Sequence, residues 1–253
     1  MLYHFLYQAL GDATIARVFK YISFRAGMAT LTAFLITIIF SPWFIRKLRD
    51  GQMKQTIRDD GPQSHLKKAG TPTMGGTIIL ASLIVSALLW SRLDIPQVWV
   101  VLGVTGVFGL VGFLDDYLKV SKKDPKGFKG SYKIVIEFAA GFAALFVLMT
   151  QTSLNSDLAI PFVWSPLKDL PSWFYLPFGA CVIVGTANAV NFTDGADGLA
   201  VGPLMTNAIV FSILSYLAGN AVFAHYLNVP YVPGSGELTV ICGAIFEIGR
   251  AHV

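Results

Sequence analysis

Long apolar runs decide what this chain can fold into. Lipid supplies no hydrogen-bond partners to an open backbone, and about 20 apolar residues of α-helix cross a bilayer core. The strict alternation of a membrane β-barrel is absent from the sequence. We therefore predict an all-α, polytopic transmembrane helix bundle with six complete spans and an incomplete seventh that starts near residue 236. The predicted complete spans are 22–45, 72–90, 97–114, 133–150, 172–190 and 199–218.

The composition agrees with this prediction and limits it to one domain. Of 253 residues, 54% are apolar and 13% are charged, whereas a soluble globular domain carries about 25% charged residues. No internal repeat divides the chain, so we predict a single integral membrane domain over residues 1–246. Residues 247–253 introduce charge into the seventh apolar run. We expect them to be a non-native tail, because IGRAHV can be encoded by a common sequencing-adapter sequence.

Lysine and arginine are unevenly distributed, and their distribution predicts the orientation of the spans. Thirteen of the 19 basic residues lie in two segments, Arg46–Lys68 and Lys119–Lys133. Loops rich in Lys and Arg stay in the cytoplasm, so both segments are predicted to be cytoplasmic and the N-terminus to lie outside. Arg17, Lys20 and Arg25 run against this pattern, and we expect them to extend to the interface at the outer end of the first span.

A basic patch is also typical of nucleic-acid-binding proteins. Both basic segments flank apolar spans, however, where the positive-inside rule already accounts for them. We therefore predict that the partner of the basic surface is the lipid bilayer and that the protein binds no nucleic acid.

Four of the 15 acidic residues fall at the predicted inner ends of two spans. Asp115 and Asp116 end the third span, and Asp194 and Asp197 follow the fifth. Carboxylates are unfavourable at a helix C-terminus without a cation, and Mg²⁺ is commonly bound by one or two carboxylates together with substrate phosphates. The pattern favours a Mg²⁺ site at Asp115 and Asp116. The alternative is a solvated loop start in which Lys119 pairs with Asp115 one helical turn away.

A second polar element covers residues 188–199, NAVNFTDGADGL. Asn191, Asp194 and Asp197 recur at every third position, which would align them on one side of a helix, although the two Asp-Gly pairs favour an irregular turn. Either geometry gathers polar groups at the end of a span. An EF-hand calcium loop is a poor alternative, because its order of ligands and its closing Glu are missing. The remaining alternative is an ordinary Asp-Gly turn between helices.

A third element covers residues 58–76, RDDGPQSHLKKAGTPTMGG. Thr71 followed by proline is typical of an N-cap and a first helical residue, so we predict that the positive end of the second span lies here and suits a phosphate. His65 and Lys68 are placed to add donors, and the Gly-Gly pair at 75–76 to allow close helix packing. The alternative is a well-capped membrane helix with a small-residue packing face, and a His65 that only bonds within its loop.

In this order and spacing, the segments RDDGPQSHLKKAGTPTMGG, FLDDYLKV and NAVNFTDGADGL resemble the polyprenyl-phosphate N-acetylhexosamine-1-phosphate transferase superfamily. Within it they look like the phospho-N-acetylmuramoyl-pentapeptide transferases, and the resemblance extends from about residue 20 to Phe246. It implies transfer of phospho-MurNAc-pentapeptide from UDP-MurNAc-pentapeptide to undecaprenyl phosphate, which gives lipid I and UMP in peptidoglycan synthesis. It also implies a Mg²⁺ cofactor, a homodimer, and an active site on the cytoplasmic face of the bacterial inner membrane.

The resemblance assigns roles to individual residues. Asp115 and Asp116 match the family's essential aspartate pair, and three lysines match its basic residues near the substrate phosphates. Together with the phosphate site predicted above, this gives Asp115, Asp116, Lys68 and Lys119 as catalytic residues, with the two aspartates as metal ligands. The predicted substrate-binding residues are His65, Thr71, Lys123, Asn191, Asp194 and Asp197.

Two other functions are weighed against this expectation. A sister transferase would move GlcNAc-1-phosphate from its UDP-sugar to the same lipid, but the TPTMGG and GPQSH segments argue against it. A membrane transporter would place charges near the bilayer midplane in broken helices, whereas here the carboxylates are predicted at span ends.

The family pattern contains two further motifs, an aspartate in a later cytoplasmic loop and a His-rich segment. Neither occurs in these 253 residues. We therefore expect the sequence to be a fragment of a longer protein, with an incomplete metal site, and we expect the fragment to be inactive alone.

Overall fold

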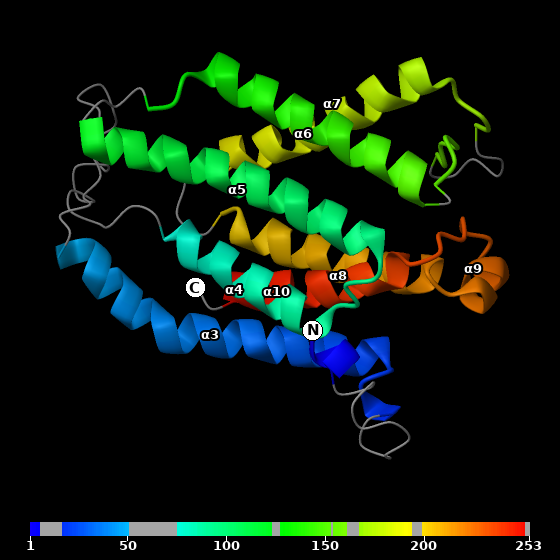
Figure 1. Cartoon of the computed structure of the whole chain (residues 1–253), viewed down its shortest axis with the longest axis horizontal. Helices are drawn as coiled ribbons and strands as arrows, with labels where there is room; N and C mark the ends of the chain where they lie inside the picture. The colour runs from blue at the N-terminus through cyan, green and yellow to red at the C-terminus, as the bar shows by residue number, and fades with distance from the viewer. Residues whose placement is uncertain are drawn as a thin grey trace.

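The computed structural model describes residues 1–5, 17–50, 75–122, 127–152, 154–160, 167–193 and 199–250. Within them the chain is helical, apart from loops and one isolated antiparallel bridge between Leu158 and Leu167. This confirms the predicted all-α class. The helices are α3 (Ile22–Asp50), α4 (Gly76–Trp90), α5 (Pro96–Lys122), α6 (Gly130–Gln151), α7 (Ser172–Thr193), α8 (Val201–Ala218), α9 (Ala221–Leu227), the 3-10 helix η2 (Ser235–Glu237) and α10 (Leu238–Arg250) (Figure 1).

Among the described residues, five helices are long and apolar enough to cross a membrane, namely α3, α5, α6, α7 and α8. The shortest of them has 18 residues, which at 1.5 Å per residue extend about 27 Å. The predicted second and seventh spans correspond to α4 and α10, which are also apolar but have 15 and 13 residues. The protein is therefore a polytopic membrane helix bundle, in which two of the seven predicted spans are shorter than expected.

The start of α4 differs from the prediction. This helix begins at Gly76 with Gly75 as its N-cap, four residues after the predicted start. Thr71, the predicted N-cap, lies outside the described residues. Glycine is a poor helix former, by about 1 kcal/mol relative to alanine, so two glycines in succession disfavour an earlier start. The predicted packing role is also not found at Gly76, where an added Cβ would meet open space.

The short helix α9 has no counterpart in the predicted spans. It begins after Asn220, whose side chain accepts hydrogen bonds from the backbone N–H groups of Val222 and Phe223. It ends at Asn228, which adopts a left-handed conformation with φ of 52°. Asparagine is favoured at both positions, so the boundaries of α9 follow from two residues of the sequence.

Successive long helices run in opposite directions, so the connections between them gather at two ends of the bundle (Figure 1). At one end α3 finishes and α4 begins, α5 finishes and α6 begins, and α7 finishes and α8 begins. We call it the Asp115 end and the opposite one the Trp90 end. Asp115, Asp116 and Asn191 lie toward the Asp115 end, as the predicted alternation of the spans requires.

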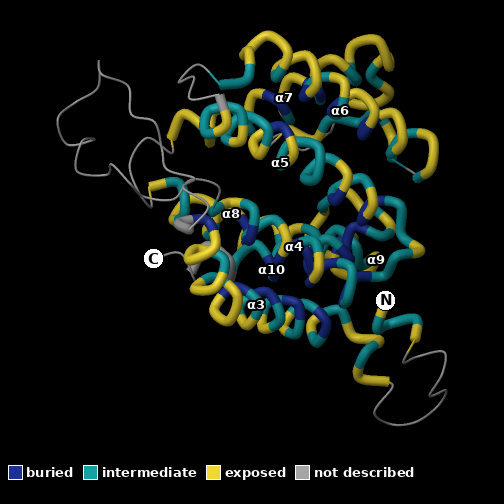
Figure 2. The backbone as a smooth tube through the Cα atoms, turned by 60° about the vertical axis from the view of Figure 1, so that its left-hand side comes forward, coloured by how far each residue is buried: buried dark blue, intermediate teal, exposed yellow. Residues whose placement is uncertain are grey.

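The helices pack as two groups. Helix α10 lies between α3 and α8 and also contacts α4, whereas α5, α6 and α7 form a layer beside them (Figures 1 and 2). Four alanines are buried where the helices of the first group meet, and small side chains of this kind let helices approach closely in lipid. Exposed residues follow the outer faces of α3, α6 and α7 (Figure 2). A cluster of buried residues in the described part of the chain consists of Ala29, Ala33, Leu83, Ala87, Trp90, Val98, Leu102, Val240, Ile241 and Ala244.

One ion pair is buried at the Trp90 end. The Nη1 and Nη2 atoms of Arg25 donate to the two carboxylate oxygens of Glu237, each at 2.6 Å, and the two side chains are 1% and 5% exposed. Nη1 also donates to the Trp90 carbonyl, and the Arg92 N–H donates to Glu237. The pair thus joins α3, the end of α4 and η2, which leads directly into α10. The prediction that Arg25 extends to the interface is wrong, because its charge is satisfied inside the bundle.

We predict that Arg25→Ala lowers the free energy of unfolding by about 3–5 kcal/mol, because it leaves Glu237 as an unpaired buried charge. Denaturant titration of the purified protein in detergent measures this. The matched control is Asp94→Asn, which removes an exposed pair with Arg92. The hydrogen bond from Arg92 lowers the pKa of Asp94, so the pair is formed at pH 7, but its loss should cost no more than about 1 kcal/mol. Equal losses in the two variants would contradict the prediction.

Candidate functional site

Helix α5 extends beyond its predicted end and carries the candidate aspartates within it. The span was predicted to end at residue 114, whereas α5 ends at Lys122. Asp115, Asp116 and Lys119 are therefore helical, and the prediction that the aspartates sit at a helix C-terminus is wrong. The helix dipole acts mainly on the last turn, so it does not bear on Asp115. Oppositely charged side chains one turn apart allow the helix to continue through this polar segment.

Asp115 accepts two hydrogen bonds that connect the end of α5 to the start of α6. Lys119 Nζ lies 2.5 Å from Asp115 Oδ2, which is the i,i+4 pair predicted from the sequence as part of the alternative to a Mg²⁺ site. The backbone N–H of Phe128 donates to the other oxygen, Oδ1, at 2.7 Å. One carboxylate thus pairs with a lysine of its own helix and holds the backbone that leads into the next helix.

Gly127 makes this contact sterically feasible. Its φ is +58°, in the left-handed region that favours glycine. A Cβ at this position would also collide with the Asp115 carboxylate and the Lys119 side chain. The backbone before α6 can therefore approach α5 this closely only with glycine at residue 127.

Asp116 has a weaker contact with Lys119 than Asp115 has. Its Oδ1 lies 3.9 Å from Lys119 Nζ, and its side chain is 42% exposed. Two carboxylates beside a lysine suit Mg²⁺ that is shared with substrate phosphates, because this ion usually takes only one or two carboxylates from a protein. Among the residues that the structure describes, no group of three or more His, Cys, Asp or Glu side chains gathers around one point. The donor set present on α5 therefore fits part of a Mg²⁺ site.

Asn191 lies at the same end of the bundle on a different helix. Helix α7 ends at Thr193, so Asn191 is in its last turn, where it is exposed. Helix α7 packs against α6, which in turn packs against α5. Asp194 and Asp197 lie outside the described residues, so their predicted alignment with Asn191 stays a prediction.

Several predicted site residues fall outside the described ranges, and their roles stay predictions from the sequence. They are Lys68 among the catalytic residues, and His65, Thr71, Lys123, Asp194 and Asp197 among the substrate-binding residues. What the structure does bring together is Asp115, Asp116 and Lys119.

A further polar cluster near this end was missed by the sequence analysis. Glu137 of α6 is buried, and its carboxylate accepts a hydrogen bond from Asn188 of α7 at 2.6 Å. Lys133 Nζ lies 3.8 Å from the same carboxylate. The available signal was an acidic residue inside the apolar run of the fourth span. Its partner lies 51 residues away, so only the packing of α6 on α7 reveals the contact.

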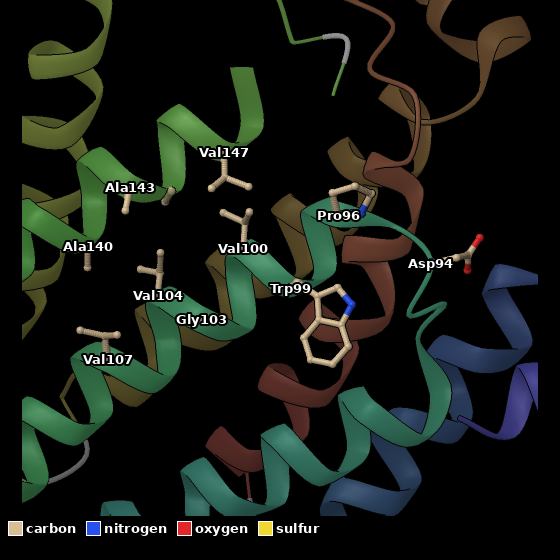
Figure 3. A pocket seen from close by; sticks show the side chains of 11 residues that line it. Asp94, Pro96, Trp99, Val100, Gly103, Val104, Val107, Ala140, Ala143 and Val147 are labelled. Atoms are coloured by element: carbon tan, nitrogen blue, oxygen red, sulfur yellow. The ribbon is translucent and has the colours of Figure 1, made fainter. Parts of the chain in front are cut away.

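The described residues also form an apolar pocket of about 460 Å³ between α5 and α6. Figure 3 shows valines of α5 facing alanines of α6, with Asp94 and Trp99 toward the Trp90 end. The side chains that line it include Val100, Val104, Val107, Ala140, Ala143 and Val147. Such a lining suits hydrocarbon and offers no donors to a phosphate, so the polar site and this pocket are separate features.

Comparison with known proteins places this arrangement in a class of membrane transferases. Residues 98–234 match the family model of glycosyl transferase family 4, a range that contains Asp115, Asp116, Lys119 and Asn191. Residues 68–80 match the phospho-N-acetylmuramoyl-pentapeptide-transferase signature 1. That range begins at Lys68 and covers the first turn of α4.

Curated relatives agree with both matches. A phospho-N-acetylmuramoyl-pentapeptide-transferase of Rhodopseudomonas palustris is 52% identical over 238 residues, which are 92% of this chain and 65% of the relative. Proteins of the same name from Pelobacter propionicus and Syntrophus aciditrophicus are each 46% identical over 98% of this chain and 69% of their own length. The chain belongs to the phospho-N-acetylmuramoyl-pentapeptide-transferase family. It spans about two thirds of the length of these relatives.

We predict that Asp115→Ala speeds hydrogen exchange at the Phe128 amide by roughly tenfold or more, because a hydrogen bond to a charged acceptor is lost. Exchange mass spectrometry on a peptide that covers the start of α6 measures this. Asp116→Ala is the matched control and should change the exchange by less than about twofold, since Asp116 does not hold this amide. Asp115→Asn should resemble the parent, because an amide oxygen still accepts the bond. Equal effects of the two alanine variants would show that Asp115 does not anchor the loop.

Proposed function

We propose that the whole protein is a Mg²⁺-dependent transferase that moves phospho-MurNAc-pentapeptide from UDP-MurNAc-pentapeptide to undecaprenyl phosphate, with lipid I and UMP as products. The observation that carries this proposal is the cluster of Asp115, Asp116 and Lys119 at one end of a membrane helix bundle, within the residues that match the family. The reaction transfers a phospho-sugar from a water-soluble nucleotide donor to a membrane lipid, so its site belongs where helix ends meet water.

The site is proposed to lie on the cytoplasmic face of the bacterial inner membrane, in a homodimer. Support for the face comes from the basic residues, since both basic segments adjoin helix ends at the Asp115 end. The family resemblance supports the dimer. The sequence-predicted residues outside the described ranges, Lys68 and His65 among them, would complete the pocket for the donor substrate.

The chemistry of the acceptor defines what the site has to do. A phosphate monoester has a second pKa near 6, so at pH 7 roughly nine tenths of undecaprenyl phosphate is already a dianion. A strong general base is therefore not needed. The barrier is the repulsion between this dianion and the anionic pyrophosphate of the donor, so the site has to bring two anions together.

The residues on α5 are suited to this task. Lys119 places an ammonium group between Asp115 and Asp116, where it can meet phosphate oxygens. Asp115 holds that lysine and the Phe128 backbone in place, and Asp116 is the looser carboxylate with oxygens for a cation. Bound Mg²⁺ would supply the positive charge that screens the two anions and aligns them.

These roles favour direct in-line displacement. An oxygen of undecaprenyl phosphate attacks the phosphorus that carries the sugar, and the bond from that phosphorus to the bridging oxygen of UMP breaks. UMP leaves with that oxygen and its electron pair. A covalent aspartyl intermediate is not needed, since the acceptor is already a competent nucleophile.

We predict that Asp116→Asn lowers kcat at least about a hundredfold, because the site loses one of the charges that bind the cation. The test protein is a full-length chimaera in which the C-terminal part of the Rhodopseudomonas palustris relative continues residues 1–246 of this chain. Formation of lipid I and UMP from the two purified substrates in detergent is measured with and without Mg²⁺. The parent chimaera should form both products only with Mg²⁺.

Asp94→Asn serves as the control, because Asp94 lies at the opposite end of the bundle and should leave kcat unchanged. Use of UDP-GlcNAc in place of UDP-MurNAc-pentapeptide would favour the sister transferase over this proposal. Incubation with the donor alone tests the mechanism, since a phospho-MurNAc adduct on either aspartate, found by mass spectrometry, would contradict direct displacement.

A further inference from the structure

The buried cluster between α6 and α7 is not explained by the proposed roles of the α5 residues. The Glu137 side chain is only 4% exposed. Its Oε2 accepts from Asn188 Nδ2 at 2.6 Å, and its Oε1 lies 3.8 Å from Lys133 Nζ. Asn188 Nδ2 also donates to the Val184 carbonyl of its own helix. A carboxylate inside an apolar interface is unfavourable unless it is paired, so an apolar residue would serve packing better at this position.

The rest of this interface is made by small apolar side chains. A Cβ added to Gly141 of α6 would lie 3.5 Å from Ala180 Cα of α7, and one added to Gly179 would meet Leu145. Such packing brings the helices close together but restrains their rotation and sliding weakly, because dispersion contacts have little directionality. The hydrogen bond between Glu137 and Asn188 is directional. It therefore fixes the rotation and the axial position of α7 relative to α6 at the Asp115 end.

The antiparallel register extends this restraint to Asn191. Gly141 lies opposite Ala180, and Glu137 is bonded to Asn188. One turn nearer the Asp115 end, the same register brings the position of Lys133 level with that of Asn191. Asn191 follows Asn188 by three residues, so the two lie on neighbouring positions of one helix face. The last turn of α7 is thus held immediately before the polar segment begins.

We propose that Glu137 is a positioning residue for the donor side of the reaction. By holding Asn188, it orients the last turn of α7 and with it Asn191, which contacts the nucleotide-sugar. This inference rests on the proposed function, because the role of Asn191 does. Glu137 is buried and does not itself touch substrate. Its loss therefore weakens binding of the UDP-linked donor and leaves binding of undecaprenyl phosphate unchanged.

A hydrogen-bond swap tests this in the full-length chimaera. Asn188→Asp places two carboxylates side by side, and it should raise the KM for UDP-MurNAc-pentapeptide roughly tenfold or more, with the KM for undecaprenyl phosphate within about twofold of the parent. Adding Glu137→Gln restores one bond with donor and acceptor exchanged, and the double variant should recover most of the loss. Glu137→Gln alone should stay close to the parent, because its amide oxygen still accepts from Asn188.

Glu237→Gln is the control for Glu137→Gln. It makes the same Glu-to-Gln change at an equally buried carboxylate, 5% exposed, at the Trp90 end. It should lower thermal stability without altering either KM. Equal increases of both KM values in the Asn188→Asp variant, or no recovery in the double variant, would overturn the inference and reduce Glu137 to a packing residue.

A readout without activity separates this inference from the proposed function. In a background with Cys181→Ser and Cys242→Ser, Asn191→Cys reports the last turn of α7 through its rate of labelling by a maleimide. Glu137→Ala should change that rate by at least about threefold, and Glu237→Gln should not, because only the former frees this turn. An unchanged rate would overturn the positioning role. Failure of the parent chimaera to form lipid I would overturn the proposed function and leave this result standing.

Discussion

A charge placed among apolar helices has to be paired, and this requirement organises both ends of the bundle. Arg25 and Glu237 pair at the Trp90 end and thereby join α3 to η2, just before α10 and more than two hundred residues along the chain. Glu137 and Asn188 play the same part between α6 and α7. Packing of apolar helices in lipid lacks the driving force that it has in water. These directional contacts therefore specify which helices pack together and in which axial register.

The spans could be predicted because membrane thickness selects apolar runs by length alone, which needs no knowledge of the packing. Their ends could not be predicted in the same way. A hydropathy criterion ends a span at the first charges, whereas a helix ends where its hydrogen bonding ends. Helix α5 accordingly continues through Asp115 and Asp116 to Lys122, and α7 continues to Thr193. The difference matters for function, because the structure places the two aspartates within a helix and not at a helix terminus.

In the candidate site, contacts within one helix could likewise be predicted from the sequence, whereas contacts between segments could not. The pair of Asp115 with Lys119 follows from i,i+4 spacing and was predictable. The bond from Phe128 to Asp115 depends on the chain reversal at Gly127, which no local pattern specifies. Arg25, Glu137 and Glu237 are conspicuous in the sequence as charges in or beside apolar runs, yet their partners emerge only when the helices are packed. Sequence motifs thus indicated the candidate substrate-binding groups, and the structure identified the contacts that hold Asp115 and Asn188 in place.

The two adjacent aspartates are not equivalent, and the helix itself is the reason. Successive residues of an α-helix point about 100° apart, so neighbouring side chains face different surroundings. Asp115 faces the start of α6, where both its oxygens accept hydrogen bonds. Asp116 points elsewhere, more exposed, with the Lys119 ammonium 3.9 Å away. Lys119 lies within reach of both, so an anion drawn to this lysine meets one carboxylate that is fixed in the fold and one that is free to share a cation. Two adjacent aspartates on a single turn of α5 thereby occupy two different environments, which is why the proposed roles differ between them.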